Sequence, residues 1–285
     1  MKTFCICFLI LFSSCINYGQ LKYIAELPSD LEENSGLQII EGSDLLWLVP
    51  DSGNKDHLYG VNAKGELLRD INIKGAKNKD WEDLAADELG NIFIGDFGNN
   101  KNSRKNLVIY KIPNPGNQKK DDLKAEEIKF NYPEQKEFPP KKENRNYDAE
   151  AFFYLDGNLY LFTKNRTKPF TGTTLVYKIP AVKGKHKAAL IGEITLCEKP
   201  KSCKVTAADI SPDKSKVVLL SHDRVWLIQD FEKDNFLNGS ILEIPLEHYS
   251  QKEAICFKTN NMVYISDEKT GPKGNNLYSL DLSNY

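Results

Sequence analysis

The chain has 285 residues, of which 40% are hydrophobic and 27% charged, and its formal net charge is -2. This length can bury a sizeable core in one large domain or two small ones. A charge so close to zero excludes the strongly basic surface that nucleic acid or an anionic membrane would require. Thirteen Tyr and fourteen Phe residues favour strands over helices, so we expect a globular β protein.

Residues 1–19 pair one Lys with a short apolar run and small polar residues, which is typical of a signal peptide and too short to span a membrane. Two cleavage sites fit. The stretch FSSC (12–15) resembles a lipobox and would leave Cys15 lipidated, which predicts an outer-membrane lipoprotein touching the membrane only through its anchor. Cleavage after Gly19 would release a secreted or periplasmic chain from Gln20. The short tether between Cys15 and the first expected strand favours this soluble form.

Residues 20–285 repeat a unit of short strands separated by turns, and helical periodicity is nearly absent. The fifth copy lacks its fourth strand, which LKYIAEL (21–27) can supply by pairing onto NLYSLDL (276–282). This pairing closes a ring and removes its open edges, so we predict one all-β domain, a β-propeller of five blades with four antiparallel strands each. A six-bladed alternative would need a blade within 113–149, where one strand is convincing. The copies start at SGLQII (35–40), DLAAD (83–87), AEAFFY (149–154), AADISPD (207–213) and EAICF (253–257).

Two loops interrupt the repeat. QKEFPPKKENRN (135–146) is a Pro- and Lys-rich insertion, expected to be a solvated loop, with a lid or substrate clamp as the alternative. Cys197 and Cys203 flank CEKPKSC, and in an oxidising compartment this spacing predicts a disulfide that closes the loop. Cys256 lies in an apolar run and is expected to be a buried free thiol.

The starts of the innermost strands bring acidic residues to one mouth of the central channel. Three glutamates in a narrow ring must bind a cation, share protons or meet Lys or Arg. Carboxylate and hydroxyl oxygens fit Ca2+ best, so we predict a channel Ca2+ held by Glu82, Glu150 and Glu253, with Ser35 and waters completing its shell. In the alternative, the glutamates accept hydrogen bonds from backbone NH groups of the next blade. The aligned column reads Ser35, Glu82, Glu150, Ala208 and Glu253.

Other polar residues are expected to make this mouth a ligand site. His222 is a candidate general base. Asp83, Asp96 and Asp209 are further candidates for catalytic proton transfer. The ends of the second strands are predicted to supply ligand contacts from Asp51, Lys164, Arg166 and Asp267, with Asp223 and Glu268 beside them.

The blocks SGL, DSGN, DWEDLA, GDFGNN, AEAFFY, ADISPD and EAICF resemble an uncharacterised family of exported bacterial β-propellers. More distantly, they are similar to TolB-like, phytase-like and gluconolactonase-like propellers, a resemblance that implies channel calcium. The column of Ser35, Glu82, Glu150 and Glu253 also resembles the calcium ring of five-bladed calcium-activated nucleotidases (apyrases). Ala208 departs from that ring, because a Ser would be expected there, and no nucleotidase motif is present elsewhere.

Two classes of function remain open on the sequence. The first is a monomeric extracytoplasmic binding or scaffold protein, with calcium as a structural pin and a small molecule, glycan or protein loop at the mouth. The second is a calcium-dependent hydrolase of phosphoesters, esters or lactones. Glycosidase activity is a weaker third option. Because no nucleophile, base and orienting residue can be assembled from the sequence, we favour binding.

Overall fold

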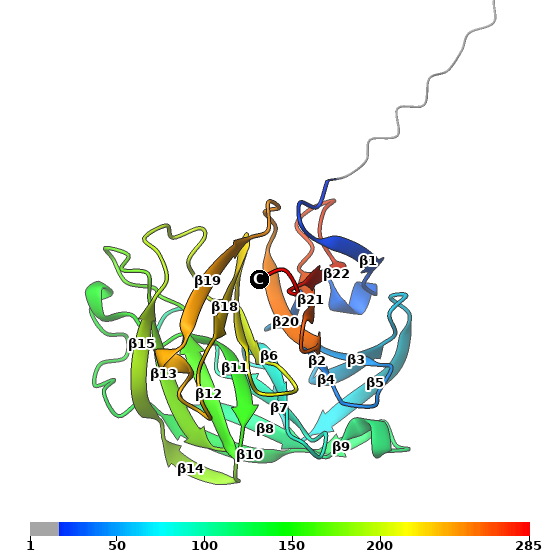
Figure 1. The fold of residues 1–285 in the computed structure, drawn as a ribbon. Coiled ribbons are helices and arrows are strands. Elements are labelled where there is room, and N and C mark those ends of the chain that lie inside the picture. The colour runs from blue at the N-terminus through cyan, green and yellow to red at the C-terminus, as the bar shows by residue number, and fades with distance from the viewer. Residues whose placement is uncertain (1–16) are drawn as a thin grey trace, which may run out of the picture.

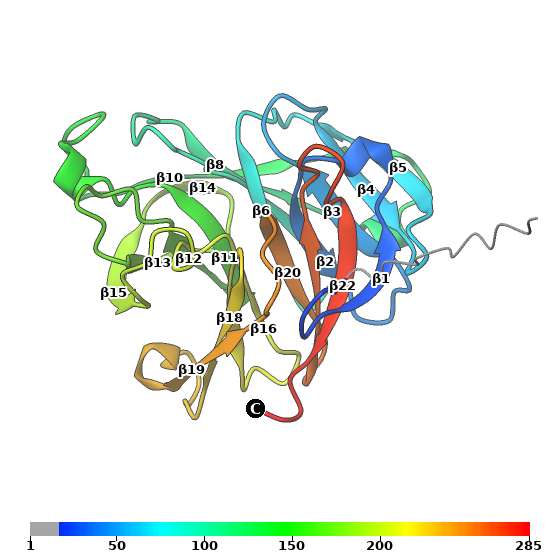
Figure 2. The ribbon, with the colours of Figure 1, turned by 90° about the horizontal axis from the view of Figure 1, so that it is seen from above.

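The computed structural model describes residues 17–285 and confirms a five-bladed β-propeller (Figures 1 and 2). Cys15 and the larger part of the expected signal peptide lie outside the described residues. Within 17–285, helix is confined to four short 3-10 turns, and no helix is long and apolar enough to cross a membrane. The turns are η1 (Ser29–Leu31), η2 (Pro115–Asn117), η3 (Lys142–Asn144) and η4 (Phe236–Asn238).

Each blade is an antiparallel sheet whose first strand lies at the axis. Blade 1 contains β2 (Asn34–Ile39), β3 (Leu46–Pro50), β4 (His57–Val61) and β5 (Leu67–Lys74). Blade 2 contains β6 (Trp81–Ala86), β7 (Ile92–Asp96), β8 (Leu107–Ile112) and β10 (Glu126–Asn131). Blade 3 contains β11 (Ala149–Leu155), β12 (Asn158–Thr163), β13 (Thr173–Pro180) and β15 (Ala189–Thr195). Blade 4 contains β16 (Ala207–Ile210), β17 (Val217–Ser221), β18 (Arg224–Gln229) and β19 (Ser240–Pro245). Blade 5 contains β20 (Lys252–Thr259), β21 (Met262–Asp267), β22 (Asn276–Asp281) and β1 (Lys22–Glu26).

The amino-terminal strand closes the ring as predicted. β1 pairs antiparallel with β22, with Lys22 opposite Ser279 and Glu26 opposite Asn276. The six-bladed alternative is wrong, because 113–149 holds only β10 and the short strand β9 (Asp122–Lys124) besides the start of β11. The open edge that an unpaired β22 would present is thus covered by the other end of the chain.

Two short parallel strands, which the repeat did not predict, join neighbouring blades. β9 belongs to the connection inside blade 2, yet it pairs with β5 at the outer edge of blade 1. β14 (Gly184–Lys187) belongs to blade 3 and pairs in the same way with β10 of blade 2. Each connection therefore reaches back to the preceding blade and extends its sheet.

Apolar side chains fill the spaces between blades. The inner strands are buried along most of their length, and β3 (LWLVP) along all of it, whereas the outer strand β5 is mostly exposed or half-buried. Five clusters of buried residues lie at the five blade interfaces, including Phe97 against Phe152 between blades 2 and 3. This burial on both faces explains why the inner strands read as continuous hydrophobic runs.

Two buried aspartates on the axis each connect three blades, including blades that are not neighbours in sequence. The Asp83 carboxylate of blade 2 accepts hydrogen bonds from the backbone NH of Phe152 in blade 3 (3.1 Å) and of Ala208 in blade 4 (3.3 Å). Asp209 of blade 4 accepts from the NH of Phe257 in blade 5 (2.7 Å) and from the Gln38 side chain in blade 1 (3.4 Å). The two carboxylates thus contact all five innermost strands.

Replacing Asp209 with Ala is expected to lower the free energy of unfolding by about 2 to 3 kcal/mol, because the Phe257 NH would lose its acceptor inside the channel. Urea unfolding measures this loss. The matched control is Asp281→Ala, since Asp281 bonds only within its own exposed turn, to Ser283. Equal losses in the two variants would contradict a role for Asp209 in joining the blades.

Asp209 also predicts a pH dependence of stability. Burial raises the pKa of this carboxyl to about 7, whereas in the unfolded chain it titrates near its ordinary value of about 4. Its contribution to stability is therefore complete below about pH 4 and is lost as the pH rises through 7. Because Asn cannot ionise, Asp209→Asn should become more stable relative to the native protein as the pH rises from 4 to 7. Urea unfolding at each pH tests this, and a difference that is flat or falls with pH refutes it.

Candidate functional site

The innermost strands begin at one mouth of the channel, which holds a cavity of about 380 Å³ that we call the start-mouth cavity. The structure brings together at this cavity all four residues of the predicted metal ring and most of the predicted ligand contacts. These residues are Ser35, Asp51, Glu82, Glu150, Lys164, Arg166, His222, Glu253 and Glu268.

Two cations compensate one of the ring glutamates. The Lys164 ammonium lies 2.8 Å from one oxygen of Glu150, and Arg166 lies 2.9 Å from the other. Burial alone would raise the pKa of Glu150, but these two cations hold it below its usual value. Arg166 also pairs with the buried Asp148 at 2.5 Å. Of the three kinds of compensation expected for the glutamates, Glu150 therefore uses Lys and Arg.

The other side of the ring is engaged as well. Glu253 lies 3.1 Å from Nε2 of His222 and 3.8 Å from Lys164. The second ring nitrogen of His222 lies 3.4 Å from the hydroxyl of Tyr249. The Ser35 hydroxyl donates to the backbone carbonyl of Trp81 at 2.7 Å, so it joins blade 1 to blade 2.

Glu82 differs from the other glutamates. Its side chain lines the cavity although the residue is only 8% exposed, and within residues 17–285 no group donates a hydrogen bond to its carboxylate and no cation pairs with it. Burial, followed by repulsion from Glu150, Asp51 and Asp80, raises its pKa well above the usual range. One oxygen from each of Asp51, Asp80 and Glu82 lies within 4.8 Å of the others, so three carboxylates converge here.

Neighbouring groups fix this arrangement of carboxylates. Asp51 also has a pKa raised to about 6, chiefly by burial, although its oxygen accepts the NH of Ser52. The backbone of Gly98, in the GDFGNN stretch, lies directly against two of the acids, because a Cβ there would overlap Glu82 and lie 2.6 Å from Cγ of Asp80. Gly98 therefore leaves room for both carboxylates at the mouth.

Five of the predicted polar residues lie outside the lining of this cavity: Asp83, Asp96, Asp209, Asp223 and Asp267. Asp223 accepts from the Ser202 hydroxyl and pairs with Arg224, each at 2.9 Å. Asp83 and Asp209 lie deeper, on the axis, and bind backbone NH groups. Asp96 is fully buried, pairs with Arg104 at 2.9 Å and accepts the NH of Asp80 at 3.1 Å, so it supports the backbone of the acid that converges on Asp51 and Glu82. Asp267 accepts from the Tyr278 hydroxyl at 2.8 Å and thereby joins β21 to β22.

The sequence reasoning missed several residues of the site. Asp80 precedes the aligned column by two positions, and the run DWED (80–83) was the signal that could have revealed it. Lys201 lines the cavity from the loop that Cys197 and Cys203 close, and Lys204 lines it from the position directly after that loop. The two cysteines form a disulfide with Cα atoms 5.5 Å apart. Tyr249, Gln251 and Asn100 complete the rim. None of the described residues of the 135–146 insertion lines this cavity.

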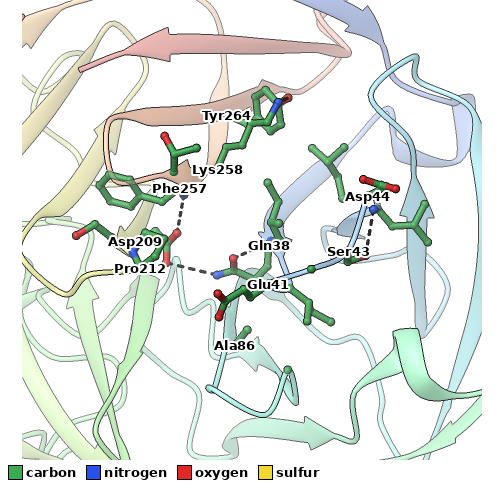
Figure 3. A pocket seen from close by; sticks show the side chains of 18 of the residues that line it. Gln38, Glu41, Ser43, Asp44, Ala86, Asp209, Pro212, Phe257, Lys258 and Tyr264 are labelled. Carbon is green, nitrogen blue, oxygen red and sulfur yellow. Dashed lines mark hydrogen bonds between the residues drawn. The ribbon is translucent and has the colours of Figure 1, made fainter. Parts of the chain in front are cut away.

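The opposite mouth of the channel opens into a wider cavity of about 1050 Å³, shown in Figure 3. Gln38 and Asp209 lie at its floor, joined by the hydrogen bond described above, and Tyr264 and Lys258 lie on one side. Its floor is therefore formed by residues that already satisfy one another. This distinguishes it from the start-mouth cavity, where the Glu82 carboxylate lacks such a contact among the described residues.

No protein-family model matches the chain, and no curated protein is similar enough in sequence to count as a relative. Among solved structures, the chain is similar to the PQQ-bound form of aldose sugar dehydrogenase from Streptomyces coelicolor. The two share 9% identity with a TM-score of 0.49, over 92% of this chain and 98% of that one. A likeness at this level carries no inference about function, and the resemblances to exported bacterial propellers and to nucleotidases remain predictions.

Gly98→Ala is expected to destabilise the protein by about 1 to 3 kcal/mol, because its methyl group would displace the Glu82 and Asp80 carboxylates in a packed region. Thermal and urea unfolding measure the loss. Gly116→Ala is the matched control, since the nearest atom to a Cβ there is the Asn114 side chain at 3.1 Å. A Gly98→Ala protein as stable as this control would show that the two acids are free to move.

Proposed function

We propose that this protein is an exported ligand-binding protein whose start-mouth cavity holds Ca2+ between Asp51, Asp80 and Glu82. The observation that carries the proposal is Glu82, a buried carboxylate that faces the cavity without a protein donor or cation among residues 17–285. A buried carboxylate without a partner is costly, and a bound cation would supply the missing charge. Asp51 and Asp80 converge on the same point.

The donor set suits a hard cation. All three groups offer carboxylate oxygens, and neither thiol nor imidazole belongs to the trio. Ca2+ takes six to eight oxygen ligands, so three carboxylates would leave coordination positions for water or for a ligand in the cavity. Of the glutamates predicted to bind the metal, this set retains Glu82. Asp51 and Asp80 take the place of Glu150 and Glu253, which pair with Lys164 and His222.

Several contacts favour binding over hydrolysis. Both ring nitrogens of His222 face other groups, Glu253 and Tyr249. The Ser35 hydroxyl donates to a backbone carbonyl, and Asp83 and Asp209 accept backbone NH groups inside the channel. Among residues 17–285, the one side-chain hydroxyl beside His222 is that of Tyr249, at 3.4 Å, and no Ser, Thr or Cys side chain forms a hydrogen bond with its imidazole.

Export is supported by the chemistry of the chain as well as by residues 1–19. The disulfide between Cys197 and Cys203 suits an oxidising compartment, whereas cytosolic thiols are kept reduced. Free Cys256 is fully buried within blade 5, so it is protected from oxidation and disulfide exchange. Calcium is also abundant enough outside cells to occupy a site of modest affinity.

Calcium at about 100 times its dissociation constant should raise the melting temperature by about 5 °C or more, since binding at that ratio adds about 2.7 kcal/mol of stability. Differential scanning calorimetry with calcium and with chelator measures the shift. Glu82→Gln should abolish it, whereas Glu232→Gln, on an exposed loop, should leave it intact. An equal melting temperature of the native protein in calcium and in chelator would overturn the proposal.

A further inference from the structure

Carboxyl groups line one side of the start-mouth cavity, and lysines line the other. Asp51, Glu82 and Glu268 line it from blades 1, 2 and 5. On the other side, Lys201 and Lys204 line it from the connection between blades 3 and 4, and within residues 17–285 neither lysine forms an ion pair. Glu150 and Glu253 lie between the two sides and are already engaged. The lysines therefore face the cavity as uncompensated positive charges.

Lys204 is crowded by other cations. Burial lowers the pKa of its ammonium group, and the nearby Arg166 and Lys164 lower it further. Those two cations are matched by Glu150 and Asp148, which leaves Lys204 without an anion of its own. An anionic ligand would relieve this repulsion, and lysine ammonium groups are well suited to bind phosphate as point charges.

The loop that carries the lysines is held in place at both ends. On the blade 3 side, the Leu196 NH donates to the carbonyl of Gly172, a glycine with φ +69° that packs against the carbonyl of Cys197. On the blade 4 side, the Ser202 hydroxyl donates to Asp223 at 2.9 Å.

The loop is also closed internally. The disulfide joins its two ends, and the NH groups of Ser202 and Cys203 both donate to the carbonyl of Lys199. A loop fixed in this way loses little conformational entropy when a ligand binds, so its lysines are presented at low cost.

We propose that the disulfide-closed loop Cys197–Cys203, together with Lys204, is an anion-binding arm that takes the phosphoryl group of a small-molecule ligand. Lys201 and Lys204 bind the phosphoryl oxygens, while the cation of the proposed function lies on the opposite side of the cavity and contacts the same ligand. Only the contact between the ligand and the cation rests on the proposed function. It selects a phosphorylated small molecule from the ligand classes left open by the sequence.

Isothermal titration with phenyl phosphate, in calcium and in chelator, tests the arm. Binding should be detectable in both conditions and tighter with calcium, and phenol should not bind. Lys201→Gln and Lys204→Gln should each weaken the affinity about tenfold, the ratio that corresponds to 1.4 kcal/mol. Lys199→Gln is the matched control, because this lysine belongs to the same loop but does not line the cavity. It should bind as the native protein does.

The outcomes separate the two proposals. Lys201→Gln and Lys204→Gln should keep the calcium-dependent rise in melting temperature, and Glu82→Gln should lose it yet retain the weaker binding of phenyl phosphate. Replacing Cys197 and Cys203 together by Ser should weaken phenyl phosphate binding while thermal unfolding reports on folding. Absence of phenyl phosphate binding to the native protein, or lysine variants that bind phenyl phosphate as tightly as the native protein does, would overturn the arm even if calcium binds. An unresponsive melting temperature with lysine-dependent phosphate binding would overturn only the calcium site.

Discussion

The ring depends on buried carboxylates that bind backbone NH groups across the axis. Innermost strands at a propeller axis have no neighbour strand on their inner edge, so their NH groups need other acceptors. Asp83 and Asp209 provide them for Phe152, Ala208 and Phe257. Because each carboxylate reaches more than one blade, it constrains the spacing of the innermost strands and of the residues at which these strands begin.

The same spacing brings the acids at the start mouth together. The charge of Glu150 is compensated by Lys164 and Arg166, both of which follow the second strand of the same blade. At the corresponding places blade 2 has Phe97 and Asn99, neither of which carries a charge, and its nearby cation Arg104 pairs with Asp96. Among the described residues, Glu82 therefore has no cation from its own blade. The charge of Glu150 is compensated by Lys164 and Arg166, whereas the Glu82 carboxylate has no such partner.

The fold could be predicted from the sequence because it depends on a local, repeated pattern of strands and turns. Because the fifth repeat lacks a fourth strand, the sequence also predicted that β1 would pair with β22. Alignment of the innermost strands correctly gathered Ser35, Glu82, Glu150 and Glu253 at one mouth. It did not predict that Asp83 would bind backbone NH groups on the axis instead of facing the mouth, since a β-bulge shifts the register between Trp81 and Asp83.

Other parts of the site could not be found by alignment. Lys201 and Lys204 belong to a connection that has no counterpart in the other blades, so no column contains them. Asp267 and Asp96 end strands that do reach the mouth, but their side chains are used by Tyr278 and Arg104. Which hydrogen-bond partner a strand-end acid takes depends on residues distant in sequence, and periodicity carries no information about them.

The parallel strands β9 and β14 make the blades unequal as building blocks. Each lies within the sequence of one blade but adds a strand to the sheet of the blade before it. Blade 2 thus supplies a strand to blade 1, and blade 3 supplies a strand to blade 2. Excising the sequence of blade 3 would strip the outer edge of blade 2 as well, and the same holds for blades 2 and 1. Blades 4 and 5 carry no such overlap among the described residues. Removing the sequence of blade 4 alone would therefore take no parallel strand from a neighbouring blade.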